Sequence, residues 1–257
     1  MTKVSDVIKA IEAVAPLRFQ DEWDNSGLQV GFAGDEVTGI LVCLDITEEV
    51  VDEALKKGCS MIVSHHPLLF HSLKQVSDCT YQQRCVAKAI KEGIAIYSAH
   101  TSLDNAPGGV NHKIAELIGL KNLEWIEPKE DSGSGLVGEL PEAMEPEQFL
   151  EKLKTIFKVE ALRYSEPAGK PIRKVALCGG AGAFLMQSAA AKEADCFITG
   201  EFHYHDYFES DGMLLVELGH YQSEQYTQDL LKDILEKALP GIQIKITEID
   251  TNPIRYR

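Results

Sequence analysis

Several histidines and carboxylates of this chain lie just past apolar runs, where the types and spacing of the residues suit metal binding. Two histidines are adjacent, and two later segments each carry a histidine followed four positions on by a carboxylate. Ligands of open α/β sheets bind at the carboxyl ends of the strands, so we expect these side chains to lie close together. Four histidines and two carboxylates are enough for two ions. The residues are His65, His66, His100, Asp104, His220 and Glu224.

The spacing within each segment supports this interpretation. His220 and Glu224 are four residues apart at the start of a predicted helix, which places both on one face, as in zinc-binding helices. The alternative is a solvated first turn in which the glutamate complements the helix dipole. Successive side chains of an extended chain point to opposite sides, so His65 and His66 can serve different ions. Pro67 keeps His66 extended.

Asp104 is a candidate carboxylate ligand, while His100 is either a ligand or a group that orients one. The mixture of imidazole and carboxylate suits Zn, Mn, Fe, Ni or Co, and the absence of cysteine ligands disfavours a structural zinc site. We therefore expect two divalent metal ions per chain.

Two further loops leave their roles open. The segment 199–206 contains Glu201 and His205, which are candidates for proton transfer or substrate contact, or else belong to a polar surface loop. The glycine-rich segment 179–184 joins a strand to a helix. It either offers backbone N–H groups to an anion or allows the helix to pack closely on the strand. It lacks the nucleotide-binding glycine patterns.

Composition places the chain among globular proteins. It has 257 residues, 44% hydrophobic and 25% charged. No apolar stretch reaches the length of a membrane span, and the N-terminus lacks a secretory segment. The six cysteines form no CxxC pair and are expected to be buried free thiols of a cytoplasmic protein. The net charge of −15 makes nucleic acid an unlikely default partner but does not exclude a nucleotide.

Continuous apolar runs alternate with amphipathic helices, a pattern typical of an α/β protein with parallel strands. The two halves resemble each other. A shift of 135 residues lays Ile40–Cys43 on Val175–Cys178, and a shift of 120 lays His100 on His220 and Asp104 on Glu224. Chance similarity between βαβ units is the alternative. We expect one lobe over 1–127 and a second over 128–257, with a polar linker near 127–135. The expected helices are 5–15, 47–57, 80–92, 110–118, 146–157, 183–193 and 222–237; the expected strands are 38–45, 60–64, 94–98, 174–178, 195–199, 213–218 and 242–249.

Five motifs together resemble the NIF3-like family of dinuclear-metal proteins, which are known in bacteria as GTP cyclohydrolase 1 type 2 homologs. The motifs are Trp23–Gly31, Ser64–Pro67, Ala99–Asp104 with Gly108–Asn111, Thr199–Glu201 with His205, and Gly219–His220 with Glu224. The resemblance implies two similar α/β lobes with a dinuclear metal site in the cleft between them, and a ring-shaped homohexamer. It also implies the metal ligands His65, His66, Asp104, His220 and Glu224, with His100 close by.

Two functions follow as hypotheses. The first is a metal-dependent hydrolase in which a metal-bound hydroxide attacks a small-molecule substrate, with a nucleotide as one class; Glu201, His205 and His100 would be its catalytic side chains. The second is a non-enzymatic metal-binding or regulatory interaction protein. The residues contain no recognisable reader of guanine, so GTP as the substrate rests on the resemblance alone.

Overall fold

The computed structural model describes residues 1–255 and 257, which form two compact units. Unit 1 consists of Met1–Leu103 and Thr227–Arg257, and unit 2 of Asp104–Tyr226. The expected bounds of 1–127 and 128–257 differ from these, because the last helix and strand of the chain belong to the sheet of unit 1.

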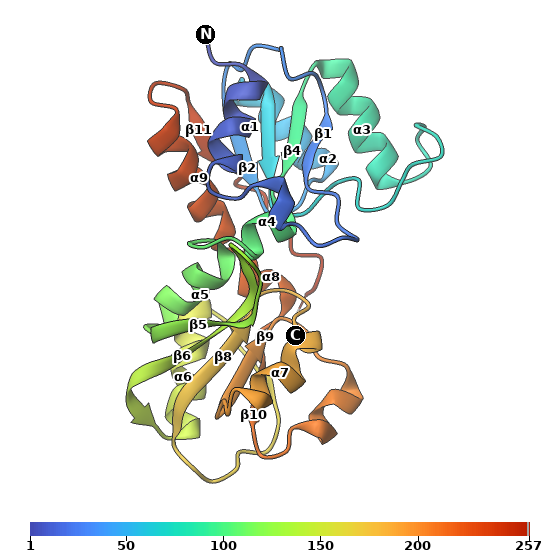
Figure 1. The fold of residues 1–257 in the computed structure, drawn as a ribbon. Helices are drawn as coiled ribbons and strands as arrows, with labels where there is room; N and C mark the ends of the chain where they lie inside the picture. Colours follow the sequence, from blue (N-terminus) through green and yellow to red (C-terminus); the bar gives the residue numbers. More distant parts are fainter. Residues whose placement is uncertain (256) are drawn as a thin grey trace. The chain divides into compact units, whose positions relative to one another are not determined.

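Unit 1 contains a five-stranded sheet of order β1-β4-β3-β2-β11 (Figure 1). The strands β2, β3, β4 and β11 are parallel, and β1 pairs antiparallel with β4. Helices α2 and α3 contact each other on one face of the sheet, and α1 contacts α9 on the other. The strands are β1 (Gly27–Val30), β2 (Ile40–Cys43), β3 (Met61–Ser64), β4 (Ala95–Ser98) and β11 (Ile244–Ile246); the helices are α1 (Val4–Glu12), the 3-10 turn η1 (Leu17–Phe19), α2 (Glu48–Lys56), α3 (Tyr81–Glu92) and α9 (Thr227–Ala238).

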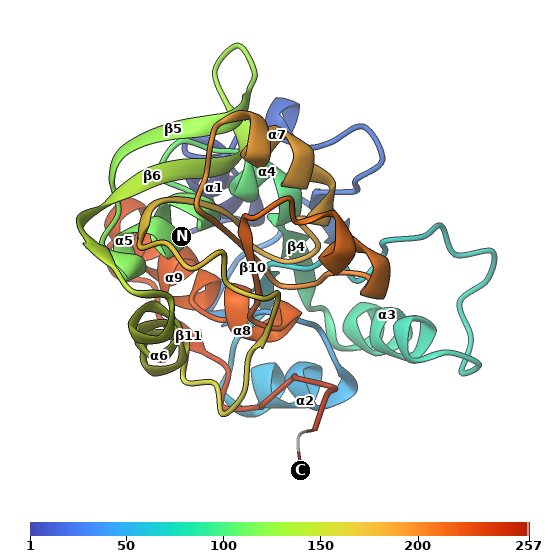
Figure 2. The same cartoon turned by 90° about the horizontal axis from the view of Figure 1, so that it is seen from below.

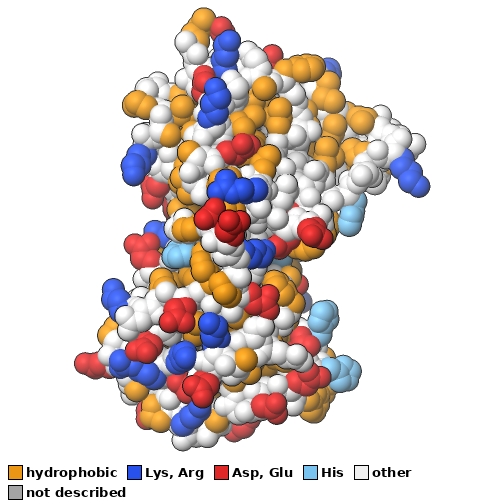
Figure 3. Space-filling view, viewed as in Figure 1, with side chains coloured by type: hydrophobic (Ala, Val, Ile, Leu, Met, Phe, Trp, Pro, Cys, Tyr) orange, Lys and Arg blue, Asp and Glu red, His pale blue; other side chains and the backbone are white. Residues whose placement is uncertain are grey.

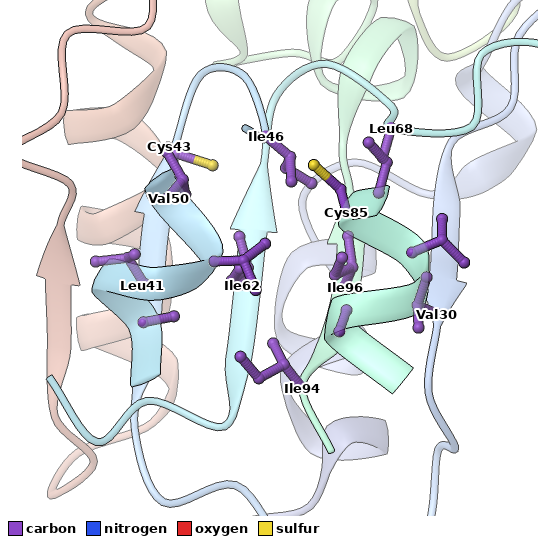
Figure 4. Close-up of a cluster of buried hydrophobic side chains, with 14 of the residues drawn as sticks. Val30, Leu41, Cys43, Ile46, Val50, Ile62, Leu68, Cys85, Ile94 and Ile96 are labelled. Atoms are coloured by element: carbon purple, nitrogen blue, oxygen red, sulfur yellow. The ribbon is translucent and has the colours of Figure 1, made fainter. Parts of the chain in front are cut away.

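The apolar runs of unit 1 form strands that are buried on both faces, as the sequence predicts. On the face shown in Figure 4, Leu41, Ile62 and Ile96 of the sheet belong to the same buried cluster as Val50 of α2 and Cys85 of α3. This packing fixes the carboxyl ends of β2, β3 and β4 beside one another, where the histidines of unit 1 follow.

Unit 2 contains a six-stranded sheet of order β5-β6-β8-β9-β10-β7. Its strands β8, β9 and β10 are parallel, while β7 and the β5–β6 hairpin pair antiparallel at the two sides. Helices α5 and α6 lie on one face and α7 on the other (Figure 2). The strands are β5 (Lys121–Pro128), β6 (Gly133–Met144), β7 (Arg163–Tyr164), β8 (Ile172–Cys178), β9 (Cys196–Thr199) and β10 (Leu214–Glu217); the helices are α5 (Val110–Ile118), α6 (Pro146–Phe157), η2 (Ala183–Leu185), α7 (Met186–Ala191), η3 (Tyr204–Glu209) and α8 (His220–Glu224).

The prediction of a linker near 127–135 was wrong. These residues form the turn of the β5–β6 hairpin, in which Glu127 pairs with Ser134 and Pro128 with Gly133. Glycine is required here by packing: a Cβ on Gly133 would lie 2.5 Å from the indole of Trp125. The glycines that suggest a linker therefore allow the hairpin to close under a tryptophan.

The internal repeat is confirmed in the register of the strands. Ile40 of β2 pairs with Met61 of β3, and Val175 of β8 pairs with Cys196 of β9, so the shift of 135 residues holds across both strand pairs. Each unit also has a short helix after its third parallel strand, α4 (His100–Asp104) and α8 (His220–Glu224). The expected single helix over 222–237 is instead the two helices α8 and α9.

No described helix is long and apolar enough to span a membrane. All six cysteines are free; four are buried as expected, Cys178 is half-buried and Cys79 is exposed. Acidic and basic side chains are interspersed on the face shown in Figure 3, so the negative net charge is not gathered into one block there.

Candidate metal centre

Three imidazole rings of unit 1 converge at the carboxyl ends of β3 and β4. His65 and His66 directly follow β3, and His100 begins α4 after β4. The ring centroids of His65 and His66 lie 4.8 Å apart, and both rings lie 5.6 to 5.7 Å from that of His100. His65 is buried, whereas His66 and His100 keep part of their rings exposed. The sequence prediction that these side chains meet is correct within this unit.

A carboxylate at the end of β2 holds the ring of His66. The Nδ1 of His66 lies 2.7 Å from Oδ1 of Asp45, and the hydroxyl of Thr251 donates to Oδ2 of Asp45 at 3.0 Å. Burial alone would raise the pKa of Asp45, but these hydrogen bonds and the charge of His66 outweigh burial and lower it. Asp45 is therefore ionised, so Nδ1 of His66 carries the proton and Nε2 is left to face a ligand.

A second carboxylate holds His100 in the same way. Oδ1 of Asp24 lies 2.6 Å from Nδ1 of His100, and Oδ2 accepts hydrogen bonds from Thr101 and Ser26. Burial opposes ionisation, but this set of donors holds the pKa of Asp24 well below its usual range. His100 adopts a φ of 34°, in the left-handed region, and its N–H donates to the carbonyl of His65 at 2.9 Å. The strained backbone and the carboxylate together fix this ring against the other two.

Unit 2 contains a histidine and a carboxylate on one face of α8, as predicted. Nε2 of His220 lies 3.2 Å from Oε2 of Glu224, and Nδ1 of His220 lies 2.9 Å from Oε1 of Glu201. Glu224 is buried, and Glu201 is exposed. His220 is thus placed between two carboxylates. Glu201, in the loop after β9, contacts this histidine and so has a defined place in the unit.

The glycine-rich loop of unit 2 packs closely and does not offer free N–H groups to an anion. The N–H groups of Gly179, Gly180 and Gly182 donate to the side chains of Asn111, Ser223 and Thr199. A Cβ on Gly180 would lie 2.4 Å from Oε1 of Glu224, and the φ of Gly180 is +64°. The loop therefore supports Glu224 directly.

Two other predicted residues lie in different surroundings. Asp104 is the last residue of α4, and its carbonyl accepts a hydrogen bond from Nδ2 of Asn111 at 3.1 Å. His205 is exposed on η3, where its ring contacts those of Tyr204 and Phe208. The roles of Asp104 as a ligand and of His205 in proton transfer stay predictions.

The sequence interpretation missed the two carboxylates that hold histidine rings. Asp45 follows β2 as His65 follows β3, so the rule that ligands gather at the carboxyl ends of strands would have found it. Asp24 lies in the loop before β1 and has no local signal, because its contact with His100 joins residues 76 positions apart.

The comparison with protein families identifies the chain. A family model described as Duf34/NIF3 (NGG1p interacting factor 3) matches residues 2–253. The chain belongs to this family. Within the NIF3 family, a Lactococcus lactis protein named GTP cyclohydrolase 1 type 2 homolog is 35% identical over 256 residues, 98% of each chain.

Solved structures of NIF3 proteins have the same fold. A Bacillus cereus protein related to NIF3 superposes with a TM-score of 0.90 at 25% identity, over 100% of this chain and 99% of that one. A Staphylococcus aureus hypothetical protein gives a TM-score of 0.91 at 27% identity, over 99% of each chain. The resemblance that the motifs indicated is therefore confirmed, as is the mixed α/β fold.

Proposed function

We propose that this chain is a dinuclear metal-binding protein that acts as a metal-dependent hydrolase on a small molecule, with nucleotides as the first class to test. The proposed ligands are His65, His66, Asp104, His220 and Glu224. The observation that carries the proposal is the arrangement in unit 1, where adjacent imidazoles converge and a carboxylate holds one of them from behind.

The donor set fits divalent metal ions. Histidines that bind metals usually donate their other ring N–H to a carboxylate, which fixes the tautomer and raises the basicity of the ligand nitrogen. His66 has this partner in Asp45, and His220 has it in Glu201. His65, His66 and Glu224 make a candidate group for one ion. Imidazole with carboxylate oxygen suits Zn, Mn, Fe, Ni and Co, and we propose no choice among them.

The proposed chemistry is hydrolysis. Paired ions lower the pKa of water and polarise an electrophilic centre. Asp45 and Glu201 hold the rings of His66 and His220, and Asp24 holds the ring of His100 toward the imidazoles of unit 1. Because Glu201 is exposed beside His220, it can also exchange a proton with a substrate. Relatives named GTP cyclohydrolase 1 type 2 homolog make GTP the first substrate to test.

Metal analysis and turnover together test this proposal. The purified chain would be loaded with Mn, Fe, Zn or Ni, its ions counted by mass spectrometry, and each form incubated with GTP and other nucleotides. We expect about two ions per chain, as in dinuclear hydrolases, and turnover that is lost in His66→Ala and Glu224→Ala while circular dichroism stays native. His203→Ala is the matched control, because this side chain is 94% exposed.

Two results would contradict parts of the proposal. A count near one ion per chain would reject a dinuclear centre. If metal binds but no nucleotide is consumed in any metal form, the hydrolase assignment fails for nucleotides. The non-enzymatic metal-binding role would then be the better account, and it predicts metal-dependent binding of a partner protein.

A further inference from the structure

Two large aromatic side chains are exposed beside the imidazoles of unit 1. Trp23 is 60% exposed and Phe70 is 44% exposed, and their ring centroids lie 5.7 Å apart with the planes inclined by 58°. The ring of His100 lies 5.9 Å from that of Trp23 and 6.0 Å from that of Phe70. The aromatic pair is therefore continuous with the three imidazoles. Rings of this size are usually buried, so their exposure at this place needs a reason.

The loops that carry the pair are held in place by a network of polar side chains. Nδ2 of Asn25 donates to the carbonyl of Leu69 at 2.7 Å, and the N–H of Leu69 donates to Oε1 of Gln29 at 3.2 Å. Nε2 of Gln29 in turn donates to the carbonyl of Asn25 at 2.7 Å. Each loop is thus tied to the other next to its aromatic residue. Trp23 and Phe70 are presented in a fixed arrangement, which lowers the entropy lost when a ligand binds.

A cavity of about 530 Å³ adjoins the pair. Phe70 and His71 line it, and so do the cationic side chain of Lys74 and the polar side chains of Thr80 and Gln83. This volume falls in the range of sites for small molecules and cofactors. Apolar rings at one side and a cation with hydrogen-bonding groups at the other suit a ligand with a planar ring and a polar or anionic remainder.

We propose that Trp23 and Phe70 form a stacking site for a planar heteroaromatic ring, and that the polar part of the same small molecule enters the adjoining cavity. This deepens the proposed function, on which it rests for the identity of the ring as part of the substrate. The inclination of the two rings lets one stack on the face of the ligand ring while the other packs against its edge. A ring bound there lies beside His100.

Fluorescence of Trp23 tests the stacking site without any need for turnover. The chain has two tryptophans, so Trp125→Phe leaves Trp23 as the one reporter. In this background, the protein would be titrated with GMP, AMP, CMP and UMP, and with ribose 5-phosphate as a probe that lacks the base. We expect saturable quenching by at least one nucleotide and none by ribose 5-phosphate. Phe70→Leu should weaken that binding by about 5- to 100-fold, the effect of losing one base–aromatic stack.

The control is Phe32→Leu, which removes an exposed phenylalanine that follows β1 and lies outside the pair. It should bind like the parent. The inference is overturned if no nucleotide quenches Trp23, if ribose 5-phosphate quenches it equally, or if Phe70→Leu binds unchanged. Emission that depends on protein concentration would assign the pair to an interface between copies and overturn it as well. Since ion counts and turnover are measured separately, loss of stacking with normal metal content would leave the metal proposal intact.

Discussion

Asp45→Asn is the sharpest test of how the histidines of unit 1 are prepared for metal. The change keeps the size of the side chain and removes its charge. In the parent, Nδ1 of His66 lies 2.7 Å from Oδ1 of Asp45, and Thr251 donates to the other oxygen. An amide at this position still accepts from the imidazole, but it no longer raises the basicity of the ring, and its NH₂ group faces the hydroxyl of Thr251.

The expected loss follows from the general effect of such outer partners. Mutation of the group behind a metal-binding histidine lowers metal affinity by about 10- to 100-fold. Tenfold corresponds to about 1.4 kcal/mol, so the expected loss is about 1.4 to 2.8 kcal/mol of binding free energy. The measurement is a competition titration of Zn or Mn against a chelator, with the unfolding midpoint recorded in parallel for the metal-free protein.

Thr251→Val is the matched control, because it removes one neutral hydrogen bond to Asp45 and leaves the charge in place. It should lower metal affinity much less than Asp45→Asn does. If Asp45→Asn binds metal as tightly as the parent, or if both variants lose affinity equally, the carboxylate does not prepare His66 for metal and the reasoning is refuted.

Two further predictions concern unit 2. Asp195 accepts hydrogen bonds from two backbone N–H groups and an ion pair from Lys170, which outweigh burial and lower its pKa. Its stabilisation is therefore present above about pH 4, the pKa of an unfolded aspartate, and is lost as the pH falls through the lower folded pKa. Urea unfolding should show Asp195→Asn less stable than the parent at pH 7 by about 1 to 3 kcal/mol, with the gap narrowing toward pH 3; a gap that does not change with pH would contradict this. Gly180→Ala should destabilise by about 2 to 4 kcal/mol, because a left-handed backbone and a clash with Glu224 combine. Gly169→Ala, with a φ of +70° and nothing within 4 Å, should lose only about 1 to 2 kcal/mol; equal losses would rule out the clash.

The sequence predicted the elements whose burial is written in their own residues. Strands β2, β3, β8 and β9 are continuous apolar runs because both of their faces are covered, and such runs are recognisable without a partner. The β5–β6 hairpin was missed because β5 is mostly exposed and polar, so its strand state depends on pairing with β6. Local sequence does not record that pairing.

The candidate site was predicted to a similar extent and for similar reasons. His65, His66, His220 and Glu224 carry a signal in their spacing, and the structure places each pair together within its unit. The partners that hold these rings are single carboxylates in loops. Asp24 is joined to His100 only by the fold, so no periodicity or spacing reveals it.

The order in which the chain leaves and re-enters unit 1 has a consequence for biosynthesis. Unit 2 is a continuous stretch, Asp104–Tyr226, whereas the sheet of unit 1 receives its edge strand β11 from residues 244–246. During synthesis, unit 2 can complete its sheet as soon as its own residues have emerged. The first hundred residues must wait for the last strand, although β2, its neighbour in the sheet, is made about 200 residues earlier. The part of the protein that is synthesised first is therefore completed last, and a chain that stops before β11 leaves one side of β2 uncovered.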